Sequence, residues 1–205
     1  LEEWNYGYTN FFVNLTGKLK KGQNHLLVVA DNSRQPNSRW YSGSGIYRPV
    51  YMYIGDTSYI KPQGIQITTL SRNEISVRVD AVKRKEETVE VFIYDQDQIV
   101  ASSQGEECTL SIPNAQNWDA EHPYLYRCVV QIRQGEKSLD RVEETFGIRT
   151  LQWGKQGLLI NDNPVKLRGA CIHHDNGILG AACFKDAEFR RVRLLKEAGY
   201  NAIRS

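Results

Sequence analysis

The sequence predicts a mainly β fold that ends in a strand–helix–strand unit, and two observations predict it. Apolar residues occupy every second position in several short runs through the middle of the chain, which is typical of strands with one buried face. Residues 166–205 then read as a buried strand, a helix and a second strand, and such a βαβ unit calls for parallel pairing. We expect three segments, over residues 1–57, 58–149 and 150–205.

The composition limits the partners and cofactors to be expected. Of the 205 residues, 24% are charged and the formal net charge is +2, so nothing in the charge favours nucleic acid or an anionic membrane as a partner. No apolar run approaches the roughly 20 residues of a membrane-spanning helix. The four cysteines lack metal-ligand spacing, and we expect no cofactor. A bridge between Cys108 and Cys128 is one interpretation, but we favour two small buried hydrophobes.

The first segment is rich in aromatic and turn residues. We predict strands over residues 11–15, 25–30 and 46–54, the first two joined by a turn at residues 20–24. Because three strands cannot close a sandwich, we expect the end of a larger β domain.

The second segment shows the clearest alternation and predicts an immunoglobulin-like sandwich of about seven strands. A strand over residues 139–146 would be the last. The residues expected to point inward on three of the strands are Ile75, Val77, Val79 and Ala81; Val89, Val91 and Ile93; and Tyr124, Tyr126, Cys128, Val130 and Ile132. We expect this segment to serve as a scaffold rather than as a reaction centre.

The third segment begins with a small hairpin over residues 158–165, followed by a strand over residues 166–172. A helix is predicted over residues 187–198, with Asp186 as its cap and Gly199 as its stop. Its predicted apolar face carries Phe189, Val192, Leu195 and Ala198, and its Arg190, Arg191, Arg193 and Lys196 are expected to be mostly solvated.

A second short strand, over residues 201–204, completes the unit. If this parallel sheet closes into a barrel, its chemistry lies at the carboxyl ends of the strands, where His173 and Arg204 fall. The chain holds only two strands of such a barrel, and its only methionine is Met52. We therefore expect a piece of a longer protein.

Four stretches of the chain, taken in order, resemble glycoside hydrolase family 2. They are Arg39-Trp40-Tyr41-Ser42-Gly43-Ser44-Gly45-Ile46-Tyr47-Arg48; Trp118-Asp119-Ala120-Glu121-His122-Pro123-Tyr124-Leu125-Tyr126 with Phe146-Gly147-Ile148-Arg149; Ile160-Asn161-Asp162-Asn163-Pro164 through Leu167-Arg168-Gly169 with His173-His174-Asp175; and Lys196-Glu197-Ala198-Gly199-Tyr200-Asn201-Ala202-Ile203-Arg204-Ser205. The resemblance implies the end of a jelly-roll sugar-binding domain over residues 1–57, an immunoglobulin-like domain over residues 58–149 and the start of a (β/α)8, or TIM, barrel over residues 150–205.

The resemblance also implies retaining hydrolysis of terminal β-linked sugars. That reaction uses two carboxylates about 5 Å apart, one as acid and one as nucleophile. The barrel segment contains only Glu188 and Glu197, both in the predicted helix. We therefore expect no catalytic glutamate here, an inactive chain on its own and a parent that is most similar to β-galactosidases.

Several residues match positions that shape the family's sugar site. Arg204 matches the arginine that contacts the nucleophile carboxylate, with a structural ion pair as the alternative. His173 matches a histidine that binds sugar hydroxyls, and a supporting role one step from the sugar is an equal interpretation. His174 and Asp175 would shape the same pocket. Adjacent residues on an extended strand face opposite ways, so we do not expect these three to bind a metal.

Three further residues complete the predicted substrate-binding set. Arg39 and Trp40 lie in the loop that, in the family, reaches the barrel mouth. Trp40 could stack on a sugar or pack in a core. Asn201 belongs to the stretch that matches the family signature.

A non-catalytic carbohydrate-binding module and a purely structural spacer are the rival interpretations. The expected partner is a carbohydrate, and family members often form dimers or tetramers, which implies a homo-oligomeric parent. The compartment is not indicated; a bacterial parent would be cytoplasmic or periplasmic.

Overall fold

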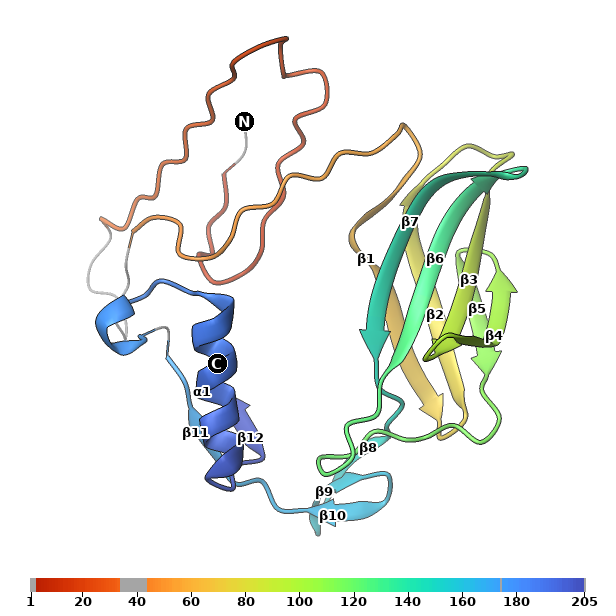
Figure 1. The fold of residues 1–205 in the computed structure, drawn as a ribbon, viewed down its shortest axis with the longest axis vertical. Helices are drawn as coiled ribbons and strands as arrows, with labels where there is room; N and C mark the ends of the chain where they lie inside the picture. The colour runs from red at the N-terminus through yellow and green to blue at the C-terminus, as the bar shows by residue number, and fades with distance from the viewer. Residues whose placement is uncertain (1–2, 34–43, 174, 205) are drawn as a thin grey trace. The chain divides into compact units, whose positions relative to one another are not determined.

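The computed structural model describes residues 3–33, 44–173 and 175–204. The chain divides into two compact units, Leu1–Pro49 and Val50–Ser205 (Figure 1).

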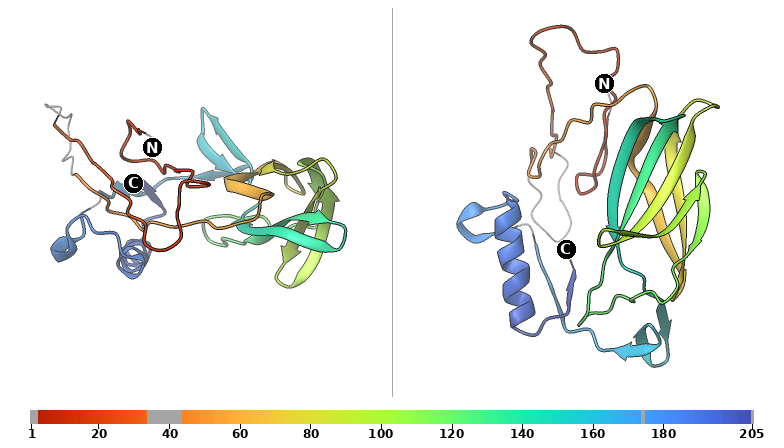
Figure 2. Two further views of the ribbon diagram at one scale, coloured as in Figure 1. Left: turned by 90° about the horizontal axis from the view of Figure 1, so that it is seen from above. Right: turned by 45° about the vertical axis from the view of Figure 1, so that its right-hand side comes forward.

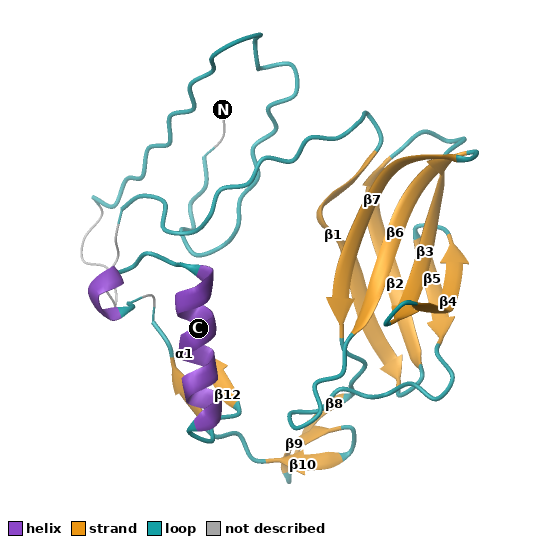
Figure 3. Cartoon of the chain, in the orientation of Figure 1, coloured by secondary structure: helices purple, strands orange, loops and turns teal. Residues whose placement is uncertain are grey.

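The described residues of the first unit form turns and extended chain, and none of them lies in a helix or strand (Figure 3). The strands predicted over residues 11–15 and 25–30 are therefore wrong. So is the one predicted over residues 46–54, since the first strand begins at Tyr59. Within the described part of this unit no neighbouring strand pairs with these residues, and apolar side chains such as Leu27 remain 88% exposed. A run of apolar and aromatic residues does not by itself hold a strand that lacks a partner.

The second unit contains a seven-stranded antiparallel sandwich, which confirms the immunoglobulin-like prediction. One sheet has the order β1-β2-β5 and the other β4-β3-β6-β7 (Figures 1 and 2). The strands are β1 (Tyr59–Ser71), β2 (Glu74–Val82), β3 (Thr88–Asp95), β4 (Gln98–Gln104), β5 (Glu107–Ser111), β6 (Tyr126–Gln134) and β7 (Lys137–Phe146).

The sandwich core contains most of the alternating residues that the sequence predicts, together with Ile60, Leu110, Ile112 and Ile148, which it does not. The predicted residues that are at most 5% exposed are Ile75, Val77, Val79, Val89, Val91, Ile93, Tyr126, Cys128, Val130 and Ile132. Two predicted core residues are only partly buried: Ala81, and Tyr124, which precedes β6 and donates its hydroxyl hydrogen to Asp95. Removing this much apolar surface from water is what stabilises the sandwich.

The cysteines of the sandwich contribute to its packing. Cys108 and Cys128 are both free thiols, as predicted. Cys108 packs against the core and Cys128 lies fully inside it. Burial raises the pKa of Cys128 to about 12, so its thiol stays neutral.

Two stretches far apart in sequence meet where the chain leaves the sandwich. The backbone N–H of Trp118 donates to the carbonyl of Ile148 at 2.8 Å. The guanidinium of Arg149 lies 4.7 Å from the centre of the Trp118 ring. A Cβ on Gly147 would come within 2.7 Å of the Trp118 side chain, so only glycine fits there. These residues belong to the stretches 118–126 and 146–149, which therefore have a structural role.

A small three-stranded sheet follows, formed by β8 (Leu151–Gly154), β9 (Gly157–Ile160) and β10 (Asn163–Val165) in the order β10-β9-β8. The predicted hairpin of β9 and β10 is confirmed, and β8 extends it. Asn161 and Asp162 form its turn with φ values of 51° and 66°, a left-handed conformation that Asn and Asp tolerate better than most residues.

Asn161 also fixes this hairpin to the end of the sandwich. It is 8% exposed. Its side chain accepts the N–H of Thr150 and donates to the carbonyl of Trp118, both at 3.0 Å. Its own carbonyl accepts a hydrogen bond from Arg72 at 2.8 Å. Through its side chain and its carbonyl, Asn161 thus connects the hairpin to Thr150, Trp118 and Arg72.

The chain continues through β11 (Gly169–Cys171), a 3₁₀ turn η1 (Gly177–Leu179), the helix α1 (Lys185–Glu197) and β12 (Ala202–Arg204). β11 and β12 pair in parallel, which confirms the predicted βαβ unit, although both strands are shorter than predicted. A Cβ on Gly169 would lie 2.9 Å from the carbonyl oxygen of Ala202, so glycine permits this close approach.

The sequence predicts the C-terminal end of α1 correctly but not its N-terminal end. Asp186 is not its cap: the N-cap is Phe184, which makes no side-chain cap bond. Asp186 lies inside the first turn, where a carboxylate complements the helix dipole. Gly199 follows the C-cap with a φ of 88°, so the predicted stop is confirmed.

The apolar face predicted for α1 is not covered in the described part of the chain. Phe189 is 71% and Val192 47% exposed, and no residue of α1 is buried. No helix in the described residues is long and apolar enough to cross a membrane.

Candidate functional site

The carboxyl end of the β11–β12 pair brings three of the predicted site residues to one edge. Cys171 pairs with Arg204, and the N–H of Ile172 donates to the carbonyl of Arg204 at 2.8 Å. His173 and Asp175 follow directly in the loop after β11, and all three predicted residues are exposed. This is the edge at which parallel α/β folds bind their ligands.

The loop after β11 is held by α1. Arg191 donates from Nη1 to the carbonyl of His173 and from Nη2 to the carbonyl of Asp175, both at 2.9 Å. Glu188, one turn earlier on the helix, lies 3.4 Å from the same Nη2. The Arg191 side chain is only 18% exposed, so the expectation of a solvated arginine is wrong. The sequence signal that could have indicated this role is the three-residue spacing from Glu188.

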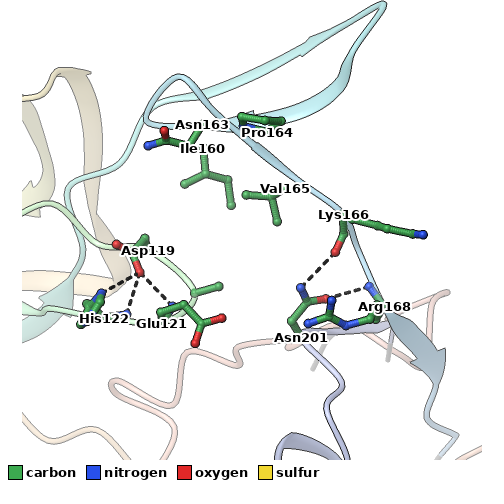
Figure 4. A pocket seen from close by; sticks show the side chains of 11 residues that line it. Asp119, Glu121, His122, Ile160, Asn163, Pro164, Val165, Lys166, Arg168 and Asn201 are labelled. Carbon is green, nitrogen blue, oxygen red and sulfur yellow. Dashed lines mark hydrogen bonds and ion pairs between the residues drawn. The ribbon is translucent and has the colours of Figure 1, made fainter.

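Asn201 lies at the opposite, amino end of the pair, directly before β12. Its side chain donates to the carbonyl of Lys166 at 3.1 Å and accepts the N–H of Arg168 at 2.7 Å (Figure 4). These bonds hold the starts of the two strands together. The structure therefore does not bring Asn201 to His173 and Arg204, and gives its amide a structural role.

A cavity of about 390 Å³ opens at this amino end, between the loop before β6, the β9–β10 hairpin and Asn201 (Figure 4). Several of its polar groups bond to the protein itself. Asp119 accepts the N–H groups of His122 at 2.6 Å and Glu121 at 2.8 Å, and the bond from His122 is the main reason why the pKa of Asp119 lies below its usual value. Arg168 donates from Nε to the carbonyl of Gly199.

The two glutamates of the βαβ unit both belong to α1. Glu188 pairs with Arg191, and Glu197 lies 3.6 Å from Arg193. Neither belongs to the edge that carries His173 and Arg204. Among the described residues no group of three histidine, cysteine or acidic side chains could hold a metal ion.

Three predicted site residues, Arg39, Trp40 and His174, lie outside the described residues. Their predicted roles stay predictions.

Comparison with known proteins identifies a family model and several relatives that match this chain. Residues 61–149, which span the sandwich, match the family model described as glycosyl hydrolases family 2. A β-galactosidase of Bacteroides ovatus is 36% identical over 97% of this chain and 26% of its own length.

Two solved structures are similar as well. A glycosyl hydrolase family 2 member from Bacteroides cellulosilyticus matches with a TM-score of 0.73 and 33% identity over 80% of this chain and 24% of that one. The β-glucuronidase of Ruminococcus gnavus matches with a TM-score of 0.65 and 29% identity over 72% and 25%.

The chain spans about a quarter of the length of these relatives. The match to the Bacteroides ovatus β-galactosidase covers 97% of this chain, so it extends from the sandwich into the segments on either side. The chain belongs to glycoside hydrolase family 2.

Proposed function

We propose that the protein containing this chain is a retaining glycosidase that removes terminal β-linked sugars, and that the carboxyl edge of β11 and β12 contributes to its sugar site. The observation that carries this proposal is the parallel pairing of Cys171 with Arg204, because β11 and β12 then end at the same edge and His173 and Asp175 follow β11 in the chain. Hydrolysis of a glycoside needs donors and acceptors for the sugar hydroxyls and a fixed cation beside the nucleophile. These three side chains supply those groups.

Each residue has a distinct role in this proposal. Arg204 holds the nucleophile carboxylate ionised and oriented through charge-assisted hydrogen bonds. His173 donates a hydrogen bond to a sugar hydroxyl, and Asp175 accepts one from another. The two catalytic glutamates come from other strands of a barrel that begins within residues 150–205. In the same proposal, residues 1–57 end a jelly-roll domain and residues 58–149 form the scaffold between the two.

A β-galactoside is the favoured substrate. The 36% identity to a protein named as a β-galactosidase supports it. A β-glucuronide is the second candidate, because the Ruminococcus relative is named as a β-glucuronidase. The two sugars differ in the configuration of the C4 hydroxyl and at C6, where glucuronate carries a carboxylate that its site must meet with a cation or hydrogen-bond donors.

The test uses the full-length protein with p-nitrophenyl β-D-galactoside and p-nitrophenyl β-D-glucuronide. Hydrolysis of the galactoside with the larger kcat/KM supports the proposal, and Arg204→Met should reduce that value on the order of 100-fold because the nucleophile loses its orientation. Arg193→Met, on the exposed side of α1, is the matched control. A full-length protein that hydrolyses neither compound would contradict the proposal.

The chain of residues 1–205 should be inactive on both compounds when purified from a host that lacks these enzymes. Turnover by this chain alone would show that its own carboxylates suffice, which contradicts the assignment of the glutamates to other strands.

A further inference from the structure

A residue of α1 helps to hold the loop that follows β11. Arg191 reaches from the helix to two main-chain oxygens, those of His173 and Asp175, at 2.9 Å each. Both acceptors are carbonyl groups, so the contact fixes the path of the backbone whatever side chains the loop carries.

We propose that Arg191 is the positioning residue of the sugar-binding edge: its guanidinium sets the direction of the His173 and Asp175 side chains. This inference rests on the function proposed above. The direction of a carbonyl and the direction of the Cα–Cβ bond at one residue are linked through the backbone torsion angles. Holding the carbonyls on both sides of position 174 therefore restricts where both side chains point.

The chemistry of this contact requires arginine. Its planar fork carries separate N–H donors at fixed angles, so Nη1 and Nη2 serve two acceptors at once, whereas a lysine ammonium is a compact charge on a flexible stem. Glu188, 3.4 Å from Nη2, fixes the fork from the helix side. With 18% of its side chain exposed, Arg191 has little freedom to leave the loop for water.

The location explains why this residue matters for function. α1 connects β11 to β12. The same short unit therefore carries the loop with His173, the strand that ends at Arg204 and the helix whose Arg191 holds the loop. A shift of the loop would alter the spacing between the hydroxyl-binding groups and Arg204. Misplacing a binding group by about 1 Å is enough to cost on the order of 100-fold in rate.

The experiment compares Arg191→Lys and Arg191→Met in the full-length protein, with Arg193→Met as the control on the same helix. We expect both Arg191 variants to lose about 100-fold in kcat/KM on whichever p-nitrophenyl glycoside the wild type hydrolyses. The inhibition constant of the free sugar should rise in parallel. Arg191→Lys should not restore activity, since charge without the fork does not hold two carbonyls.

Two further measurements separate positioning from a general loss of stability. The Tm of the Arg191 variants should stay near that of Arg193→Met. The amides of the loop after β11 should exchange faster with deuterium, while those of the sandwich should not change. A common fall in Tm and in sandwich protection, or kinetics equal to those of Arg193→Met, would overturn the proposal.

A failure of the proposed function gives a different result. If the wild type hydrolyses neither glycoside but the Arg191 variants still release the loop amides, the sugar assignment is wrong and Arg191 positions the loop for another ligand. If the loop amides are equally protected in all variants, the positioning role itself is wrong.

Discussion

The sandwich and the βαβ unit of the same chain differ in how much of their structure each can bury. Every strand of the sandwich has an antiparallel partner, and residues such as Val91, Ile93 and Val130 are fully shielded from water. The unit of β11, α1 and β12 has a two-stranded parallel sheet and a helix in which no residue is buried. The sandwich is stabilised by its own buried core, whereas the βαβ unit leaves apolar side chains such as Phe189 exposed.

This difference is consistent with the roles that we propose for the two regions. A rigid, self-contained sandwich is suited to hold other parts in place. A parallel pair with an open carboxyl edge offers N–H groups, carbonyls and polar side chains to a ligand. The difference in burial between the sandwich and the βαβ unit can be tested by measuring the same property at one residue in each region.

The largest expected effect concerns thiol reactivity. At pH 8, a pKa of about 12 leaves roughly one Cys128 thiol in 10,000 as the reactive thiolate, and burial blocks the reagent as well. Cys171, in β11, is exposed. Labelling with iodoacetamide followed by mass spectrometry should modify Cys171 at least about 1,000-fold faster than Cys128. Similar rates would mean that the sandwich opens as readily as the βαβ unit.

The next effect is on the free energy of unfolding. Ile93→Ala removes a fully buried side chain from the sandwich core and should cost about 2–5 kcal/mol. Phe189→Ala removes an exposed aromatic ring from α1 and should change the stability of the 205-residue chain by no more than about 0.5 kcal/mol. Urea titration followed by near-ultraviolet circular dichroism measures both. A large cost for Phe189→Ala would show that α1 is covered in solution.

A smaller effect on the free energy of unfolding is expected where the β9–β10 hairpin meets the end of the sandwich. Asn161→Ala leaves the N–H of Thr150 and the carbonyl of Trp118 without their partners. Its cost should be about 1–3 kcal/mol, accompanied by faster amide exchange in β8 to β10. Gln156→Ala, in the exposed turn between β8 and β9, is the control. Equal behaviour of the two variants would mean that the hairpin is not fixed through Asn161.

The smallest expected effect is a dependence of stability on pH that arises from Glu87 of the sandwich. Glu87, 3% exposed, accepts the N–H of Arg84 at 2.7 Å, and this bond lowers its pKa below 4.5. A carboxyl whose pKa falls on folding adds stability above its unfolded pKa, and that stability is lost as the pH falls through the folded value. Glu87→Gln should therefore reduce the urea midpoint at pH 7 more than at pH 3. Glu86→Gln, at an exposed neighbour, should reduce neither.

The sequence allowed most of the sandwich to be predicted because its signal is local. Alternation placed Val89, Val91 and Ile93 in the core, since each strand repeats every two residues and each has a partner to bury against. The parallel pairing of β11 and β12 was predictable from the helix between them. The strands predicted before residue 55 are wrong because their apolar and aromatic runs have no paired neighbour in the described residues.

The site was less predictable because its contacts involve the main chain. Arg191 bonds to two carbonyls, and Asn161 to a carbonyl and an N–H, and such main-chain partners leave no side-chain pattern in the sequence. Only the three-residue spacing of Glu188 and Arg191 gives a sequence signal. Asn201 was expected at the sugar, but its amide serves the starts of two strands. Phe184 caps α1 in place of Asp186 because the helix begins earlier than its apolar pattern.

The parallel pairing of Gly169 with Ala202 also sets an order of events on the ribosome. All seven strands of the sandwich precede residue 150, so they can close while the following residues are still in the exit tunnel. β11 then emerges without its partner until α1 and β12 have been synthesised, an interval of a few seconds at roughly 5–20 residues per second. The edge that we assign to the sugar is thus one on which ribosome-bound chaperones can act while the protein is being made.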